Sequence, residues 1–253
     1  MLSPLVTIVT PVYNSIDYVG DSIQSVINQT FQNWEMILVD DGSNDGSFEL
    51  ISSINKIENR IKIIRNKENR GPGISRNKAI KLAKGKYIAF LDSDDLWHKD
   101  KLNIQIELME ENKWSFSHTS YGYVSKQGKK IKSTFHVSNH SINYFNLLKR
   151  TEISCLTAVY NQKVLGKCYM TEHRKKQDYA LWLSILKKGV KSQPIDIELA
   201  YYRQRPDSVT SNKSLLILSH VRFLMETQSM NLIQALYYTS FWMVNGFIRY
   251  FVK

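Results

Sequence analysis

Three carboxylates, Asp92, Asp94 and Asp95, stand within four positions directly after the apolar run Tyr87–Leu91. A continuous apolar run of this length predicts a strand that is buried on both faces of a sheet. In open α/β sheets, ligands bind beyond the carboxyl ends of the strands. Adjacent carboxylates repel one another, and a divalent cation such as Mg²⁺ or Mn²⁺ would relieve that repulsion beside a substrate phosphate. The stretch therefore indicates a metal site, and the alternative is a solvated turn in which Asp92 or Ser93 caps a helix.

A second strand with an acidic end supports the metal-site interpretation. Met36–Val39 is apolar and is followed directly by Asp40 and Asp41. Strand and helix patterns alternate through the first 95 residues or so, which predicts an α/β fold with a mostly parallel sheet flanked by helices. Right-handed crossovers then bring Thr10, Asp40, Asp41 and the Asp92–Asp95 cluster to one edge of the sheet. Two acidic strand ends at one edge favour a binding site over solvated turns.

Several local signals set boundaries that a structure can test. Pro11 has no amide donor and is expected to end the first strand. Asn14–Ser15 is expected to begin the first helix, and Ser75 to cap a later one. Residues 114–137, with Lys126–Gly128 at their centre, read as a β-hairpin.

The basic charge is confined to the second part of the chain. Residues 1–100 carry 12 Lys and Arg against 13 Asp and Glu, whereas residues 101–253 carry 22 against 10, a net charge of +12. From the charge alone, this distribution indicates an anionic partner for the second part: lipid headgroups, a phosphorylated substrate or nucleic acid. Cys155 and Cys168 form neither a disulfide framework nor a metal-ligand pattern and are expected to be free thiols. The N-terminus shows no secretory signal.

Taken in order, the motifs resemble the family 2 inverting glycosyltransferases of the GT-A fold. The resemblance extends through roughly residues 5–210, and it is carried by Thr10–Asn14, Val39–Ser47, Asn69–Gly71 with Arg76–Asn77, Phe90–Asp95, and Gln177–Tyr179 with Leu181–Trp182. No single motif decides the assignment, but the ordered set is highly specific.

The resemblance implies a donor site in the first half of the chain. Thr10, Pro11 and Tyr13 would line the nucleotide-base pocket, and Asp41 would contact the base or the ribose. Arg76 would lie against the base or the phosphates. Asp92 and Asp94 match the family's Asp-x-Asp element, which holds Mn²⁺ or Mg²⁺ against the donor diphosphate, so that Asp92 also counts as a nucleotide contact. Asp95 is a neighbouring candidate.

The resemblance also implies a catalytic base and an acceptor side. Asp178 matches the family's base, although a cap of the following helix is the structural alternative. Gln177 stands where the family usually has Glu, which leaves the base in place but changes the contact beside it. Arg203 and Ser208 lie in a segment that in such enzymes often closes near the diphosphate. Inverting transfer needs one base and a neutralised leaving group but no protein nucleophile, and these residues meet that requirement.

The expected function is therefore transfer of a sugar from a nucleotide sugar, with UDP favoured, to a glycan or a polyprenyl-diphosphate-linked acceptor. The resemblance suggests bacterial surface polysaccharide synthesis, of O-antigen or capsule type. Two other classes compete: a sugar-nucleotide nucleotidyltransferase, which should carry a Gly-rich loop that Pro11–Asn14 lacks, and a non-catalytic basic protein that binds membrane surfaces. Nucleic acid is not expected as a partner.

The C-terminal residues predict an amphipathic helix. The expected organisation is a glycosyltransferase domain over residues 1–212, with a nucleotide-binding half (1–100) and an acceptor half (101–212), followed by a helical tail over 213–253. The apolar face of the tail carries aromatic side chains, which suits a helix lying in the headgroup region of the inner face of the plasma membrane, with a helix packed on the domain as the alternative. This face comprises Ile233, Leu236, Tyr237, Phe241, Val244, Phe247, Ile248 and Phe251. The opposite face carries Gln234, Tyr238, Asn245, Arg249 and Lys253.

Overall fold

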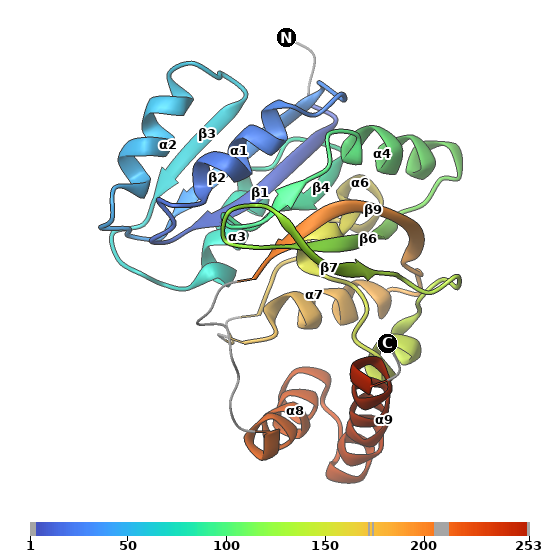
Figure 1. The fold of residues 1–253 in the computed structure, drawn as a ribbon. Helices are drawn as coiled ribbons and strands as arrows, with labels where there is room; N and C mark the ends of the chain where they lie inside the picture. The colour runs from blue at the N-terminus through green and yellow to red at the C-terminus, as the bar shows by residue number, and fades with distance from the viewer. Residues whose placement is uncertain (1–3, 172, 174, 205–212, 252–253) are drawn as a thin grey trace.

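The computed structural model describes residues 4–171, 173, 175–204 and 213–251, and its centre is a single curled sheet with helices on both faces (Figure 1). The first part of the chain alternates strands with helices, as the sequence predicts: β1 (Val6–Val12), α1 (Val19–Ile27), β2 (Trp34–Asp40), α2 (Ser47–Asn55), β3 (Ile61–Arg65), α3 (Pro72–Leu82) and β4 (Tyr87–Phe90). These four strands pair in parallel in the order β3-β2-β1-β4. The α/β fold class is therefore confirmed.

The second part of the sheet has mixed strand directions. The strands are β5 (Leu96–Trp97), β6 (Phe116–Val124), β7 (Lys130–Phe135), β8 (Val159–Asn161) and β9 (Gln193–Arg203). β8 joins β4 and β6 in antiparallel pairing, β6 pairs in parallel with β9, and β5 closes the sheet against β9. β6 and β7 form the predicted hairpin. The helices of this part are α4 (Lys101–Glu111), α5 (Tyr144–Lys149), the 3₁₀ turn η1 (Cys155–Thr157), α6 (Gln162–Leu165) and α7 (Gln177–Leu186).

The three local boundary predictions were wrong, each for a physical reason. β1 continues through Pro11, which pairs with Val39 of β2. Val12 bonds toward β2, since its O accepts from Asp41 N, so the neighbouring Pro11 faces β4 on the other side. β4 has already ended at that level, and the missing amide of Pro11 therefore costs no hydrogen bond in the sheet. α1 begins at Val19, because Asn14 and its neighbours bond to the loop before α2 instead of starting a helix. Ser75 lies inside α3, which begins at Pro72.

The core is double, with one apolar layer on each face of the sheet. One layer packs the sheet against α1, α2 and α4, and the other packs it against α3, α5, α7 and the C-terminal helices. In the second layer, Trp182 of α7 stands edge-on to Phe90 of β4, with ring centroids 5.3 Å apart. Trp182 is therefore a core residue that fixes α7 against the strand leading to the acidic cluster.

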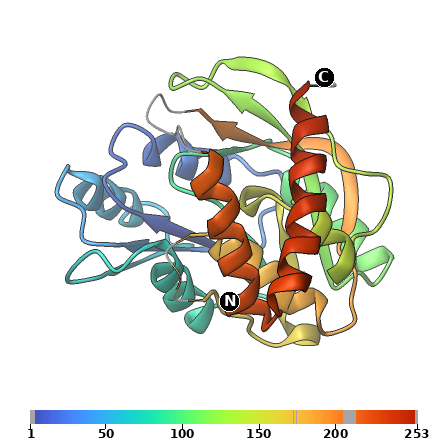
Figure 2. The same cartoon turned by 90° about the horizontal axis from the view of Figure 1, so that it is seen from below.

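Two helices end the described chain, α8 (Lys213–Gln228) and α9 (Leu232–Phe251), and they lie side by side below α7 (Figures 1 and 2). α9 is tied to the domain through its more polar face: Trp242 Nε1 donates to Thr151 Oγ1 at 2.8 Å, and Asn245 Nδ2 donates to Lys149 O at 3.0 Å. Its apolar face is largely exposed, since Ile233, Val244 and Phe247 are all more than half exposed. No helix in that part is long and apolar enough to cross a membrane.

A buried lysine on α4 gives the fold a pH-dependent stability. Lys101 is fully buried, and its Nζ donates to Gln105 Oε1 and to Thr157 O. Burial lowers the pKa of Lys101 to about 7, whereas the pKa of lysine in an unfolded chain is about 10.4. Between these two values the unfolded chain binds more protons than the folded one, so the free energy of unfolding rises with pH.

We expect wild-type protein to gain about 1 kcal/mol of unfolding free energy per pH unit between pH 7 and 9, relative to Lys101→Met. Urea unfolding of both proteins at several pH values measures this difference. The exposed neighbour Lys99, changed to Met, is the control and should follow the wild type. Parallel curves for wild type and Lys101→Met would show that Lys101 does not titrate in this range.

Candidate active site

The acidic cluster follows β4 at the carboxyl edge of the sheet, as predicted. Asp92 and Asp94 are partly exposed, whereas Asp95 is buried and its Oδ1 accepts from the main-chain N of Arg203 at 2.9 Å. Burial and the nearby charges of Asp94 and Asp92 raise the pKa of Asp95 well above its usual range. The three carboxyl groups are therefore close enough to act on one another electrostatically, and Asp92 and Asp94 are the two that reach the solvent.

Arg76 of α3 connects this cluster to the predicted base. Its Nη2 forms an ion pair with Asp92 Oδ1, and its side chain is 9% exposed. Burial disfavours the Arg76 cation, but the charges of Asp92 and Asp178 contribute to raising its pKa above the ordinary value. Arg76 thus pairs with Asp92, just after β4, and its charge also acts on Asp178 of α7.

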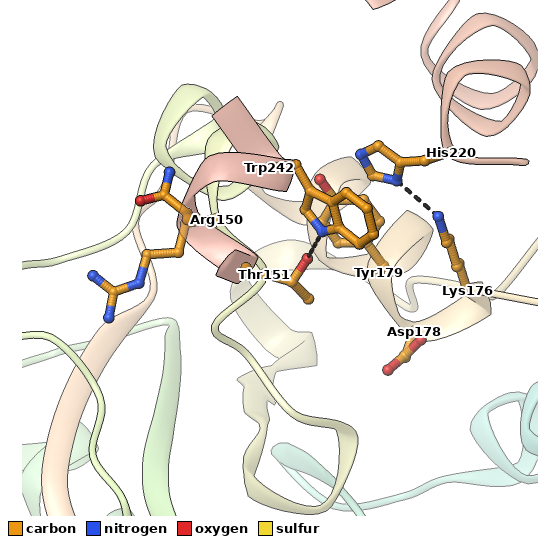
Figure 3. A pocket seen from close by; sticks show the side chains of 9 residues that line it. Arg150, Thr151, Lys176, Asp178, Tyr179, His220 and Trp242 are labelled. Atoms are coloured by element: carbon orange, nitrogen blue, oxygen red, sulfur yellow. Dashed lines mark hydrogen bonds between the residues drawn. The ribbon is translucent and has the colours of Figure 1, made fainter. Parts of the chain in front are cut away.

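Asp178 is the second residue of α7, which begins at Gln177, so it stands inside the first turn and is not the N-cap residue of this helix. Burial raises the pKa of Asp178, while the amide of Tyr179 and the charge of Arg76 oppose this shift. The residue also keeps contact with a cavity of about 320 Å³ (Figure 3). A carboxylate with a raised pKa at a cavity wall is suited to accept a proton from a ligand hydroxyl.

Asp41 has a supporting position next to this centre. Its Oδ2 accepts from Gly71 N at 2.7 Å, and its Oδ1 accepts from Asn66 Nδ2 at 2.5 Å. These bonds hold the loop that begins α3, the helix that carries Arg76. Thr10 and Pro11 are buried at the end of β1, whereas Tyr13 is 47% exposed just beyond it. The role of these four residues in nucleotide binding stays a prediction.

The predicted acceptor-side residues fall in three different settings. Gln177 is buried against Gly73, where a Cβ would lie 2.6 Å from the Gln177 amide carbon, so it joins α7 to the first turn of α3.

Arg203 is the last residue of β9, and its side chain is 1% exposed. Its guanidinium donates to Asp94 O at 2.7 Å and to Asp21 Oδ2 at 3.1 Å. Arg203 therefore shapes the acidic turn from within the protein, and its place near the donor diphosphate stays a prediction. Ser208 lies outside the described residues.

The two cysteines are buried free thiols, as predicted. Burial raises the pKa of the Cys155 thiol, even though Arg76 favours its ionised form. Cys155 is thus a protonated neighbour of the centre and not a nucleophile. Within the described residues, no three His, Cys, Asp or Glu side chains are arranged to hold a metal ion.

Sequence reasoning missed a second group of residues at the cavity. Arg150, Thr151, Lys176, His220 and Trp242 line it together with Asp178 and Tyr179, which the Gln177–Tyr179 motif already includes (Figure 3). His220 belongs to α8 and Trp242 to α9, so the C-terminal helices form part of the wall. No local motif marks these residues, because they meet only through tertiary packing.

Comparisons with known proteins agree with this arrangement. Residues 7–168 match the model of glycosyl transferase family 2. TuaG of Bacillus subtilis, named for teichuronic acid biosynthesis, is 42% identical over 210 residues, which are 83% of either chain. The Escherichia coli UDP-Glc:alpha-D-GlcNAc-diphosphoundecaprenol beta-1,3-glucosyltransferase WfaP is 37% identical and covers 97% of this chain and 95% of its own.

Among solved structures, S. aureus TarS 1-349 in complex with UDP-GlcNAc superposes with a TM-score of 0.73 at 20% identity, over 98% of this chain and 76% of that one. The structural superposition shows the fold, whereas the family model and the sequence relatives show the family. The chain belongs to glycosyl transferase family 2 and has the GT-A fold.

Proposed function

We propose that this glycosyltransferase moves a sugar, with inversion, from a UDP-sugar to a sugar carried on a polyprenyl diphosphate, in the synthesis of a bacterial surface polysaccharide. The observation that carries the proposal is the position of Arg76, which pairs with Asp92 and acts electrostatically on Asp178. One cation thus pairs with the acidic turn and also favours the ionised form of the proposed base. The names of TuaG and WfaP, and the UDP-GlcNAc complex of TarS, support the substrate classes.

The residues supply what a single displacement needs. The acceptor hydroxyl attacks the anomeric carbon of the donor, its proton passes to Asp178, and the bond to the diphosphate oxygen breaks with its electron pair leaving on the nucleotide. No protein nucleophile takes part, in agreement with the protonated Cys155. The raised pKa of Asp178 makes it a stronger base once ionised. Arg76 stabilises that ionised form before transfer.

The donor set at the acidic turn fits a divalent cation. Asp92 and Asp94 are partly exposed carboxylates whose charges raise the pKa of Asp95, so negative charge is concentrated there. Mg²⁺ and Mn²⁺ sites of this kind commonly use one or two carboxylates and complete their coordination with substrate phosphates. We therefore propose Asp92 and Asp94 as the residues that hold Mn²⁺ or Mg²⁺. When bound, the ion would supply Lewis-acid stabilisation of the departing diphosphate.

The test is nucleotide binding with and without metal. We expect UDP to raise the melting temperature more with Mn²⁺ than without it, because a ligand that binds only the folded state stabilises it. Asp94→Asn should reduce the metal-dependent part of this increase by half or more. Glu111→Gln, an exposed change at the end of α4, is the control. A melting temperature that UDP and Mn²⁺ leave unchanged in wild type would reject the proposed donor.

We further propose that the apolar face of α9 binds the membrane surface. Leu232, Ile233, Leu236, Tyr237, Val244 and Phe247 are all at least half exposed on this helix. Lys149 Nζ lies 5.0 Å from the Phe241 ring of α9, so a basic group stands beside the apolar residues. An apolar helix face with flanking cations suits an anionic bilayer surface. It would also bring the enzyme to a lipid-linked acceptor.

We expect the triple variant Ile233→Ser, Val244→Ser, Phe247→Ser to bind phosphatidylglycerol vesicles at least about tenfold more weakly than wild type, because each side chain loses apolar burial in the bilayer. Sedimentation with vesicles measures this affinity. The matched control is Ile57→Ser, Ile131→Ser, Val164→Ser, which changes three exposed apolar residues elsewhere. If the α9 triple variant and the control bound equally well, the face would have another role, and a wild-type dimer lost in the triple variant would assign it to self-association.

A further inference from the structure

The cavity beside Asp178 is built from segments that are distant in the sequence. Arg150 and Thr151 follow α5, Lys176 and Asp178 stand at the start of α7, and the C-terminal helices complete the wall. Figure 3 shows Lys176 extending toward His220, with Trp242 beside them and Asp178 on the neighbouring part of α7. The cavity therefore joins the proposed base to a group of residues that the transfer mechanism has not used.

Lys176 is the unusual member of this group. Its backbone has a positive φ of 58°, and its Nζ donates to His220 Nδ1 at 2.7 Å. The ammonium also lies 5.2 Å from the Trp242 ring and 5.6 Å from the Phe223 ring. Burial lowers the pKa of Lys176 to about 8 and, together with the charge of Lys176, that of His220 to about 3. At neutral pH a lysine cation therefore donates to a neutral histidine.

This cation has no anionic partner among the residues that the structure describes. Its ring and histidine contacts are with neutral groups, and no described carboxylate pairs with it. A partly buried charge is costly unless it is paired. Lysine has three N–H donors, and the single bond to His220 leaves two of them for a ligand. An anion that enters the cavity could therefore bond to this ammonium.

We infer that Lys176 binds the diphosphate of the acceptor and so makes the enzyme specific for phosphate-linked sugars. This inference rests on the proposed function, since Asp178 must accept the proton of the same acceptor. A sugar ring lying along the cavity would bring its hydroxyl to Asp178 and its diphosphate to Lys176, which stands two residues earlier on the same wall. His220 and Trp242 hold the ammonium in place, so α8 and α9 contribute to acceptor binding as well as to the exposed face.

The alternative is that Lys176 only anchors the C-terminal helices to α7. The two roles differ in their dependence on the ligand, because an anchor would affect every acceptor equally, whereas a diphosphate contact affects only acceptors that carry the phosphates. Lys176→Met keeps the aliphatic stem between the rings and removes the charge. Lys175→Met is the matched control, since Lys175 is the exposed neighbour. Lys176→Arg restores the cation.

The experiment measures binding of two probes in the presence of saturating UDP: α-GlcNAc-diphosphate-farnesyl, and the farnesyl glycoside of GlcNAc without phosphate. We expect Lys176→Met to raise the Kd of the first probe about tenfold or more, the scale of a lost hydrogen bond to a charged group, and to change that of the second less than about twofold. Lys175→Met should match wild type, and Lys176→Arg should recover most of the loss.

Equal weakening for both probes, or no weakening for either, would overturn the assignment, as would a wild-type protein that binds neither probe. Failure of the proposed function has a different signature, since in that case UDP gives no stabilisation and no sugar is transferred. Diphosphate-dependent binding that is sensitive to Lys176 would survive that result.

Discussion

Replacing Asp178 by Asn should lower kcat for sugar transfer by between about 100-fold and 10,000-fold, the range for losing a general base. Asn keeps the size of the side chain and cannot accept the hydroxyl proton as a carboxylate does. UDP binding should stay close to wild type, because Asp178 is not among the residues proposed to hold the donor. Initial rates with saturating donor and acceptor, together with the UDP-induced rise in melting temperature, separate the two effects.

The pH profile gives the same residue a second readout. Burial raises the pKa of Asp178, so the ionised, active form is lost on acidification at a higher pH than for an ordinary aspartate. Activity of wild type should therefore rise with pH through that raised pKa, and Asp178→Asn should lack this limb. Glu49→Gln is the control, because it removes a first-turn carboxylate from another helix, α2. Full activity in Asp178→Asn would show that another group takes the proton.

The parts of the site that could be predicted are those that depend on residues close together in the sequence. The apolar run Tyr87–Leu91 and the carboxylates after it give a buried strand with an acidic end, and the structure places that end at the sheet edge. Strand period and helix period likewise predicted the alternating first part of the fold. The order of the motifs then predicted Asp178 as the base, and its helix packs on β4 through Trp182.

The parts that could not be predicted depend on contacts between distant residues. The resemblance placed Arg203 at the start of a loop near the diphosphate, but no sequence signal indicated that its guanidinium bonds the main chain of the acidic turn from the end of β9. Lys176 carries no motif, since its partners His220 and Trp242 come from the last two helices. The spacing of apolar residues predicted the two faces of α9. Only the tertiary structure shows that the more polar face contacts the domain.

Arg203 leads to the second large expected effect. Its guanidinium donates to Asp94 O, Lys126 O and Asp21 Oδ2, and its own amide donates to Asp95 Oδ1. Arg203→Met would leave two carbonyl oxygens and the Asp21 carboxylate without these donors. Hydrogen bonds to a charged group contribute about 1.5–3 kcal/mol each, and water can replace part of what is lost, because Asp21 and Lys126 are exposed. We expect the free energy of unfolding to fall by about 2–4 kcal/mol, measured by urea unfolding.

The same substitution should also weaken the donor site, because Arg203 fixes the main chain of the turn that carries Asp94. The metal-dependent part of UDP stabilisation should fall together with the folding stability. Arg203→Lys should recover little of either, since an ammonium cannot reproduce a planar fork that bonds three separate oxygens. Arg222→Met is the control; this side chain is 80% exposed on α8, and its loss should change stability by less than about 0.5 kcal/mol. An Arg203→Met protein with wild-type stability and metal-dependent UDP binding would mean that the acidic turn holds its shape without the buried guanidinium.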